Sequence, residues 1–468
     1  MNTSKPYYQL IPEKVFQDFS TIIDLLRPQI KGFNTDYLKE LISILSIHIR
    51  KDQEATPLKM KYIKILVPQG DKYLKGLIDL GIIERSGFAK VGESCYKYNF
   101  SPEYFSKYLS FPLHNAKLIL RIEKANEEIR KDPVNSVRGH SEQIKYLKLL
   151  TINDGYKDYL DSNYIANTKQ YNDIQAAATR IMIKPEPVGK VDETSGRFHS
   201  IVTNMAKGLR PFLRIKGEPL VNIDIKNSQP YLSTIILTDP SKVSWLTKNH
   251  DFALLLQSLK VSLNQDVKLY INLVVSGQIY EYLMQEFSQE GLTLTRDETK
   301  RQVLRILFAR NRLPKDEINR KCRLIFKDRF PMVHRIFSKV RGRERGDKFK
   351  NFKRFAILLQ SIESYLMLDL ILKRIYKELP GTIAITIHDS IMTGILTNNV
   401  EAVKNIMTEE LQNFVGIKPT LKIENFDLLN FKQSIYMNKE EKEGREGENI
   451  NSNQYHATTF VSNNNSMN

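Results

Sequence analysis

Two short segments, far apart in the chain, constrain its fold most strongly. The first is E-P-L-V-N-I-D-I, which contains Asp224, and the second is I-A-I-T-I-H-D-S, which contains Asp389. Each has the apolar, β-branched character and the length of a buried strand. The second reads as two strands that meet at a tight turn, with His388 and Asp389 at its tip. An aspartate at the end of a buried strand can stand at the edge of a cleft, so both carboxylates are candidate ligands for hard divalent cations.

Composition narrows the class of protein. The chain has 468 residues, of which 41% are hydrophobic, enough for two or three folded domains. Its formal charge is +17, which favours a polyanionic partner or an anionic membrane surface. Nucleic acid is the better candidate, because no apolar stretch reaches the roughly 18 residues of a membrane span and the N-terminus lacks a signal-peptide core. We expect no membrane association.

Cysteine usage points to a reducing compartment. Only Cys95 and Cys322 are present, so neither a disulfide framework nor a four-cysteine zinc site can be formed. A cytoplasmic location is therefore the expectation.

Residues 1–110 have the pattern of a separate module. Helical spacing over 38–49 and 71–80 is followed by two β-like runs, 82–85 and 94–100. This order resembles a winged helix-turn-helix, with Lys72 and Lys75 on the candidate recognition helix and Lys90 in the wing. The alternative is a small α+β module that packs on the rest of the protein and touches no DNA.

Two further regions differ in composition from the segments that contain the aspartates. Residues 111–190 show a helical, highly charged pattern, which is typical either of helices that bind a nucleic-acid duplex or of a solvated spacer. Residues 437–468 change abruptly to a Lys/Glu run and then an Asn/Ser-rich stretch, so we expect a disordered tail there.

A basic helix is expected between the two aspartates. Arg296, Lys300, Leu304 and Phe308 recur every four residues and therefore form one stripe along a helix. Cations at one end and an aromatic ring at the other suit a nucleoside triphosphate lying along the helix. Taken alone, a basic helix is more commonly a solvated face and an aspartate more commonly a turn or cap residue. The functional interpretation therefore requires that the basic helix and the two aspartates lie together in the folded protein.

Six segments, in the same order, resemble the family A polymerases: bacterial DNA polymerase I, its phage relatives, and the single-subunit RNA polymerases of phages and mitochondria. The resemblance covers roughly residues 190–430. The segments are S-G-R-F-H-S (195–200), the approach to Asp224 (209–224), the basic helix (295–308), I-F-K-D-R-F-P-M-V (325–333), L-L-Q-S-I-E-S-Y-L (358–366) and I-H-D-S (387–390).

This resemblance implies an α+β right-hand fold. The palm, residues 191–436, would contain an antiparallel sheet and a helical fingers insertion at about 270–345, and residues 111–190 would form a reduced helical thumb. Asp224 and Asp389 would bind two Mg²⁺ ions, with the carbonyl of Ile225 as a further ligand. The substrates would be dNTPs and the partner primed template DNA.

The resemblance also implies roles for individual side chains. Arg296 and Lys300 would hold the triphosphate, and Lys300 would stabilise or protonate the leaving pyrophosphate. Leu304 would lie beside the incoming sugar, and Phe308 would stack on the nascent base pair. In addition, Arg197, Arg210 and Gln360 would contact the duplex in its minor groove, and His388 would lie near the primer terminus.

Departures from the family pattern concern the choice of sugar. Ser390 follows the second aspartate, as in the single-subunit RNA polymerases, where the DNA polymerases have Glu. Gln229 stands where those DNA polymerases place a Glu that blocks the ribose 2′-hydroxyl. Three features favour DNA synthesis. The interval between the aspartates is too short for the insertions of the single-subunit RNA polymerases, and the L-L-Q-S segment resembles that of the DNA polymerases. In addition, Phe308 lacks a hydroxyl that could sense a ribose 2′-hydroxyl.

The resulting hypothesis is a DNA-directed DNA polymerase without a proofreading exonuclease. Its composition, rich in Asn, Lys and Ile, suggests an AT-rich genome, such as that of a mobile element or phage. Separately, we expect a monomer that works with accessory replication proteins. Two alternatives stay open: a single-subunit RNA polymerase or primase, and a non-catalytic DNA-binding replication factor that would use the N-terminal module and the basic run 341–354.

Overall fold

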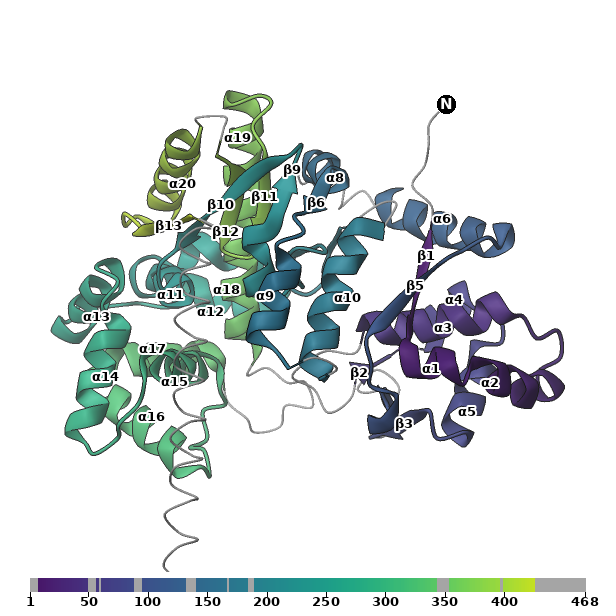
Figure 1. The fold of residues 1–468 in the computed structure, drawn as a ribbon. Helices are drawn as coiled ribbons and strands as arrows, with labels where there is room; N and C mark the ends of the chain where they lie inside the picture. The colour runs from purple at the N-terminus through teal and green to yellow at the C-terminus, as the bar shows by residue number, and fades with distance from the viewer. Residues whose placement is uncertain are drawn as a thin grey trace, which may run out of the picture.

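The structure, a computed structural model, describes residues 7–48, 56–58, 60–87, 95–131, 140–165, 168–183, 189–342, 353–395 and 399–425. The expected tail (437–468), the wing residue Lys90 and most of the basic run lie outside these ranges. Two large hydrophobic cores organise the described residues, one in the N-terminal module and one beneath the main sheet and through the helices that follow it; a third, small cluster joins Leu10 and Tyr108. Figure 1 shows the two parts side by side.

The N-terminal module is built from short helices and a three-stranded sheet. Its elements are β1 (Tyr8–Pro12), α1 (Glu13–Gln17), α2 (Phe19–Leu26), η1 (Arg27–Gln29), α3 (Thr35–His48), β2 (Thr56–Pro57), α4 (Met60–Leu66), α5 (Gly70–Asp79), β3 (Ile83–Ser86), β4 (Lys97–Phe100) and η2 (Pro102–Tyr104). The antiparallel sheet has the order β2-β4-β3. The helices and strands expected at 38–49, 71–80, 82–85 and 94–100 are thus confirmed within the described residues, while their assignment as a winged helix stays a prediction.

The exposed face of α5 carries as many acids as bases. Lys72 and Lys75 are exposed as expected, but Asp71 and Asp79 share that face. Asp71 also pairs with Lys64 at 3.1 Å, which lowers the pKa of its carboxyl. The charge of α5 itself therefore gives little attraction for a phosphate backbone.

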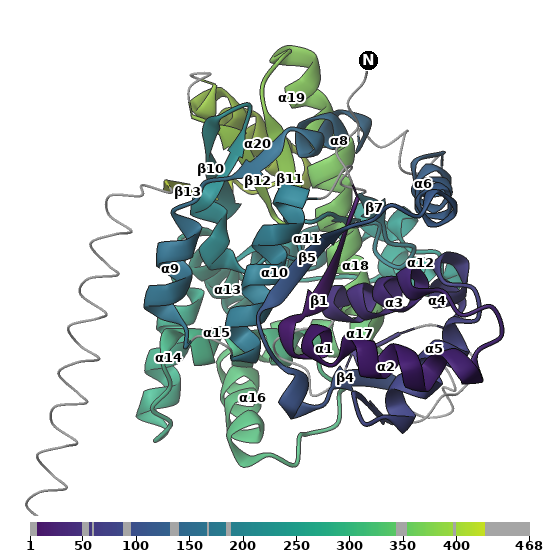
Figure 2. The ribbon, with the colours of Figure 1, turned by 45° about the vertical axis from the view of Figure 1, so that its right-hand side comes forward.

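The segment 111–190 is less purely helical than expected. It contains α6 (Ala116–Lys131), α8 (His140–Lys148), α9 (Tyr156–Asn163) and α10 (Lys169–Ile183), but also the strand β6 (Leu150–Ile152). Strand β5 (Tyr108–Pro112) pairs with β1 across the expected boundary at residue 110. Helix α10 contacts both α3 and β5, and Figures 1 and 2 show it between the main sheet and the N-terminal module.

The main sheet is antiparallel and holds the two aspartate segments side by side. Its order is β11 (Ala384–Ile387), β12 (Ser390–Gly394), β10 (Glu218–Ile225), β9 (Leu213–Ile215) and β6, with β13 (Leu421–Asn425) on the other edge of β10. Both predicted aspartate strands are confirmed. A small hairpin, β7 (Lys190–Val191) with β8 (Phe198–His199), lies outside this sheet.

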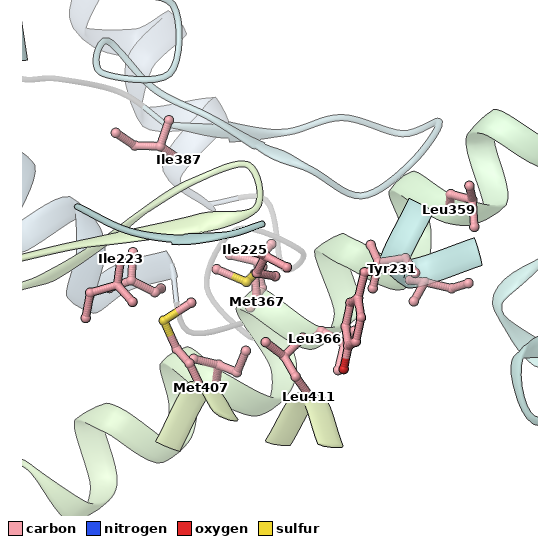
Figure 3. Packing of buried hydrophobic residues seen from close by; sticks show 14 of the residues in the cluster. Ile223, Ile225, Tyr231, Leu359, Leu366, Met367, Ile387, Met407 and Leu411 are labelled. Carbon is pink, nitrogen blue, oxygen red and sulfur yellow. The ribbon is translucent and has the colours of Figure 1, made fainter. Parts of the chain in front are cut away.

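One face of β10 packs on helices. Ile223 and Ile225 are buried against a long helix and against α20 (Val400–Val415); Met367 and Met407 lie in the same cluster (Figure 3). The long helix consists of α18 (Arg354–Ser364), a π-helical stretch η6 (Tyr365–Ile371) and α19 (Leu372–Glu378). Because side chains alternate along a strand, Asp224 points to the opposite face, away from this core.

A helical block follows β10 in the chain. It begins with α11 (Ser228–Thr238), η4 (Pro240–Leu246) and α12 (His250–Ser258) and continues with α13 (Gln265–Val275), α14 (Ile279–Gln289), α15 (Arg296–Phe308), α16 (Glu317–Arg329) and α17 (Pro331–Arg341). The helical insertion expected at about 270–345 therefore begins at residue 265. Helices α13 to α17 lie together in Figure 1, away from the N-terminal module.

The long helix 354–378 is the one described helix whose length and composition would also suit a membrane span. Its most apolar window is 61% buried inside the protein, as expected for the central helix of a folded core. This feature by itself is weak evidence for a membrane.

Candidate functional site

Strand pairing brings the two aspartates to one end of the sheet. Asp224 lies opposite Ser390 in the antiparallel register of β10 and β12, so Asp389 is one residue from its partner. Asp389 and His388 form the two-residue turn between β11 and β12. His388 has a φ of 54°, the positive value that such tight hairpins require. The predicted turn is therefore confirmed, with the second carboxylate fixed beside the first.

The electrostatics of Asp224 indicate that negative charges gather here. Burial and the neighbouring carboxylates of Asp389 and Glu424 raise the pKa of Asp224 to about 7. Lys300 and Lys207 act in the opposite direction, so both cations are close enough to influence it. A carboxyl whose charge is opposed by burial and by like charges is a strong candidate for a functional group.

The third carboxylate, Glu424, was not predicted from the sequence. It lies on β13, paired with Asn222, and its Oε1 accepts a hydrogen bond from Lys207 Nζ at 3.0 Å. Burial acts to raise the pKa of Glu424, but the hydrogen bond and the charge of Lys207 outweigh it and lower that pKa. The alternation of Lys422 and Glu424 in L-K-I-E-N was the available signal, because it predicts a half-buried strand.

Arg210 faces these carboxylates from η3 (Lys207–Phe212). Burial lowers the pKa of its guanidinium, while Glu424, Asp224 and Asp389 act to raise it. Its Nε is buried and has no hydrogen-bond partner among the described residues. The side chain predicted to contact the duplex therefore lies close enough to the three acids to interact with their charges.

The helix expected at 295–308 is confirmed as α15. Its start is fixed by a capping box, in which Thr295 accepts from the Glu298 backbone N–H and the Glu298 carboxylate accepts in return. Lys300 is exposed and influences Asp224, whereas Leu304 and Phe308 are half-buried, with Phe308 packed against the main core.

Arg296 is engaged within the protein instead of standing free. Its Nε donates to Glu281 Oε1 at 2.6 Å, and its guanidinium lies over the ring of Tyr280, 5.4 Å from the centroid. Burial raises the pKa of Tyr280, and the charge of Asp389 adds to this. Tyr280 and Glu281, which sequence reasoning missed, thus both contact Arg296 at the start of α15, and the charge of Asp389 acts on Tyr280.

A second cluster adjoins the aspartates. Glu363 on α18 is 2% exposed and accepts from Arg197 Nη2 at 2.8 Å and from Gln229 Nε2 at 2.6 Å. Burial and the charge of Asp389 raise the pKa of Glu363 to about 8, despite the opposing effect of Arg197. Arg197 and Gln229, predicted separately, are joined by an acid that the sequence did not reveal.

The remaining predicted side chains lie around these two clusters. Gln360 is half-buried, one helical turn before Glu363 on α18. Burial lowers the pKa of His388, with Arg197 adding to the effect, and its ring lies 6.0 Å from that of His199.

Several polar atoms around the site lack partners among the described residues. They are buried and comprise Arg197 Nε, Arg210 Nε, Asn222 Oδ1, Asn227 Nδ2, Ser228 Oγ, Gln229 Oε1, Glu363 Oε1 and His388 Nδ1. Buried polar groups are normally satisfied, so a concentration of this kind is typical of a site that binds an ion or a polar ligand.

The donor set fits magnesium. Asp224 and Asp389 supply carboxylate oxygens and the Ile225 backbone supplies a carbonyl, all hard ligands. Within the described part of the chain, no group of three or more His, Cys, Asp or Glu residues could hold a metal by itself.

The comparisons with known proteins add little. No protein-family model matches the chain, and no curated protein matches it. Among solved structures, it is similar to the POL domain of Pol1 from M. smegmatis in complex with DNA primer-template and dNTP, with a TM-score of 0.32 and 10% identity, over 90% of this chain and 67% of that one. Similarity at this level does not establish a shared fold.

Proposed function

We propose that this protein is a template-directed nucleotidyl transferase that adds deoxynucleotides to primed DNA by a two-metal mechanism. One observation carries the proposal. Asp224 and Asp389 share one end of an antiparallel sheet, where their charges interact and Lys300 of α15 acts on the same carboxyl. An acidic pair opposite a cationic helix suits a reaction in which metal ions and a triphosphate must meet.

The two aspartates and the carbonyl of Ile225 would hold the ions. Two Mg²⁺ ions bound there would supply Lewis acidity, lowering the pKa of the primer 3′-hydroxyl and neutralising charge on the leaving pyrophosphate. Since the pKa of Asp224 is raised to about 7, a proton occupies part of this site near neutrality and divalent cations would displace it.

The cations of α15 would bind the triphosphate. Lys300 is exposed and near Asp224, so its ammonium can stabilise or protonate the departing pyrophosphate. Arg296 must exchange Glu281 for a phosphate before it can help, which would couple nucleotide binding to a local rearrangement at the start of the helix. Leu304 would contact the sugar, and Phe308 would stack on the new base pair.

The cluster around Glu363 supports deoxyribose as the sugar. Gln229, expected beside the sugar of the incoming nucleotide, is fixed by its hydrogen bond to Glu363 and so cannot swing aside freely. A side chain held in this way leaves less room for a 2′-hydroxyl. Arg197, Arg210, Gln360 and His388 would contact the duplex and its primer end.

In this proposal the main sheet is the palm of a right hand, α13 to α17 are the fingers, and the helices of 111–190 are the thumb. The protein would act as a monomer in the cytoplasm, in the replication of a mobile element or phage. The balanced charge of α5 favours an N-terminal module that packs on the rest of the protein over one that binds in a major groove.

Primer extension tests the function directly. Purified protein should extend a labelled primer on a DNA template with Mg²⁺ and dNTPs, and Asp389→Ala should not, because the variant lacks a metal ligand. NTP use without a primer would identify an RNA polymerase or primase instead. Inactivity of the wild-type protein in every mixture, with intact binding to DNA, would leave only the non-catalytic factor.

A further inference from the structure

A pocket beside the proposed active site contains the chain's only tryptophan. Its volume is about 720 Å³, and its walls come from the β7–β8 turn (192–196), the segment from η4 into α12, and one side of α18 and η6. Trp245, at the rim, is 58% exposed. None of the side chains assigned above to metal or triphosphate binding lines it.

Trp245 is held in a fixed orientation despite its exposure. Its Nε1 donates to the carbonyl oxygen of Lys242 at 3.0 Å. Its ring meets that of Tyr365 edge to face, with centroids 4.8 Å apart and an interplanar angle of 85°. An indole that is oriented by the protein and more than half open to solvent is a ready platform for another flat ring.

The exposed charges around the platform are mixed, with a small positive excess. Lys190 and Lys248 are exposed at the pocket. Of the acids that line it, Asp192 accepts hydrogen bonds from Ser195 and lies 3.2 Å from His199 Nε2, while Asp369 pairs with Lys373. Two of the three acids in the lining are thus engaged within the protein, whereas the third, Glu193, is exposed. Lys248 Nζ donates a hydrogen bond to the backbone oxygen of Glu193 at 3.3 Å, and Lys190 and Lys248 together outnumber that exposed carboxylate.

The pocket adjoins two side chains expected to contact the duplex. Arg197 follows the β7–β8 turn that forms one wall, and Ser364 of α18 donates a hydrogen bond to Gly196 in that turn. Gln360 immediately precedes Ser361, a lining residue. A strand leaving the duplex near Arg197 and Gln360 would therefore pass close to Trp245.

We propose that this pocket binds single-stranded nucleic acid, with a base stacked on Trp245 and the adjoining phosphates near Lys190 and Lys248. The site extends the proposed function, since a polymerase must keep its template single-stranded ahead of synthesis, and its occupant would be the template overhang. Binding here requires neither Mg²⁺ nor nucleotide, so it is measured separately from catalysis.

The single tryptophan makes the test direct. A short oligothymidylate, added in EDTA, should quench the protein's tryptophan fluorescence to saturation, and its affinity should fall as salt rises. By fluorescence anisotropy of a labelled oligothymidylate, Trp245→Ala should weaken binding by about ten-fold or more, and Trp245→Phe by clearly less. Leu254→Ala is the matched control, because Leu254 is 49% exposed on the neighbouring helix α12 and lies outside the pocket.

Other outcomes are equally informative. Unchanged oligonucleotide affinity in Trp245→Ala, or equal quenching by heparin, which has no bases, would overturn the proposal. If Trp245→Phe weakens oligonucleotide binding as much as Trp245→Ala does, the proposal is also overturned, because a phenyl ring can still stack on a base. If the oligonucleotide quenches the fluorescence but the protein does not extend a primer, the pocket binds nucleic acid and the proposed polymerase function is wrong. If the protein extends a primer without any quenching, the polymerase function is supported and the proposed binding pocket is wrong.

Discussion

Replacing Asp224 by asparagine should abolish nucleotide addition while leaving the fold intact. The expected loss is at least about 1,000-fold, as is usual when a group at the reacting centre is removed. Asparagine keeps the shape but offers the metal ions a neutral and weaker ligand. The measurement is single-turnover extension of a primed template. DNA affinity should change little, because the proposed role of this carboxylate is to bind metal and asparagine has the same size.

The same substitution should stabilise the protein in the absence of divalent metal. The pKa of Asp224 is raised to about 7 from the ordinary value of 3.8, so between these pH values the native state holds a proton that the unfolded chain has lost. Stability therefore falls as pH rises through this window, and asparagine escapes that loss. The gain should be about 1–3 kcal/mol near pH 8 and vanish near pH 4.

Thermal unfolding in EDTA measures this effect, and Asp158→Asn, an exposed aspartate in the first turn of α9, is the control. A variant that is both inactive and less stable at alkaline pH would show that Asp224 has a structural role instead. Stabilisation with loss of activity is the expected mark of a site that is strained until metal binds.

Replacing Lys300 by alanine should lower kcat/KM for the incoming nucleotide by about 100-fold. The ammonium is exposed on α15 and its charge acts on Asp224, so in the proposed mechanism it would contact both the triphosphate and the leaving pyrophosphate. Lys300→Arg separates the two roles. Arginine keeps the charge and should restore KM, but it does not release a proton and should restore kcat only in part.

Arg301→Ala is the matched control for Lys300→Ala. Arg301 is the next residue of the same helix and is also exposed, but its side chain is rotated by about 100° around the helix axis relative to that of Lys300. Pre-steady-state kinetics with a fixed primed template give KM and kcat separately. Equal defects in Lys300→Ala and Arg301→Ala would mean that the helix acts through its overall charge and that Lys300 has no specific role.

The sequence predicted the elements that local patterns determine. The strand ending near Asp224, the hairpin carrying Asp389 and the helix beginning at Arg296 lie where they were expected. Each has a short-range cause: β-branched runs, a two-residue turn, and a capping box with four-residue spacing. Their meeting at one edge of the sheet was expected only from the family resemblance, because no local pattern fixes the pairing of strands so distant in the chain.

Long-range contacts account for what was missed. Glu363 lies in a largely apolar helix, and nothing in S-I-E-S reveals that Arg197 and Gln229 will converge on it. Glu424 reaches Asp224 only because β13 pairs with β10. The salt bridge between Arg296 and Glu281 depends on how α14 and α15 pack, so a helical stripe alone could not reveal that the guanidinium is already engaged.

The most direct test of the site is to locate its metal ions. Crystals of the protein with primed DNA, a non-hydrolysable dNTP and Mn²⁺ in place of Mg²⁺ should give anomalous density between Asp224 and Asp389, with each carboxylate roughly 2.0–2.4 Å from a metal. The triphosphate should lie along α15 with Lys300 on its phosphates. Mn²⁺ bound elsewhere, with both carboxylates free of metal and nucleotide, would contradict the proposed function.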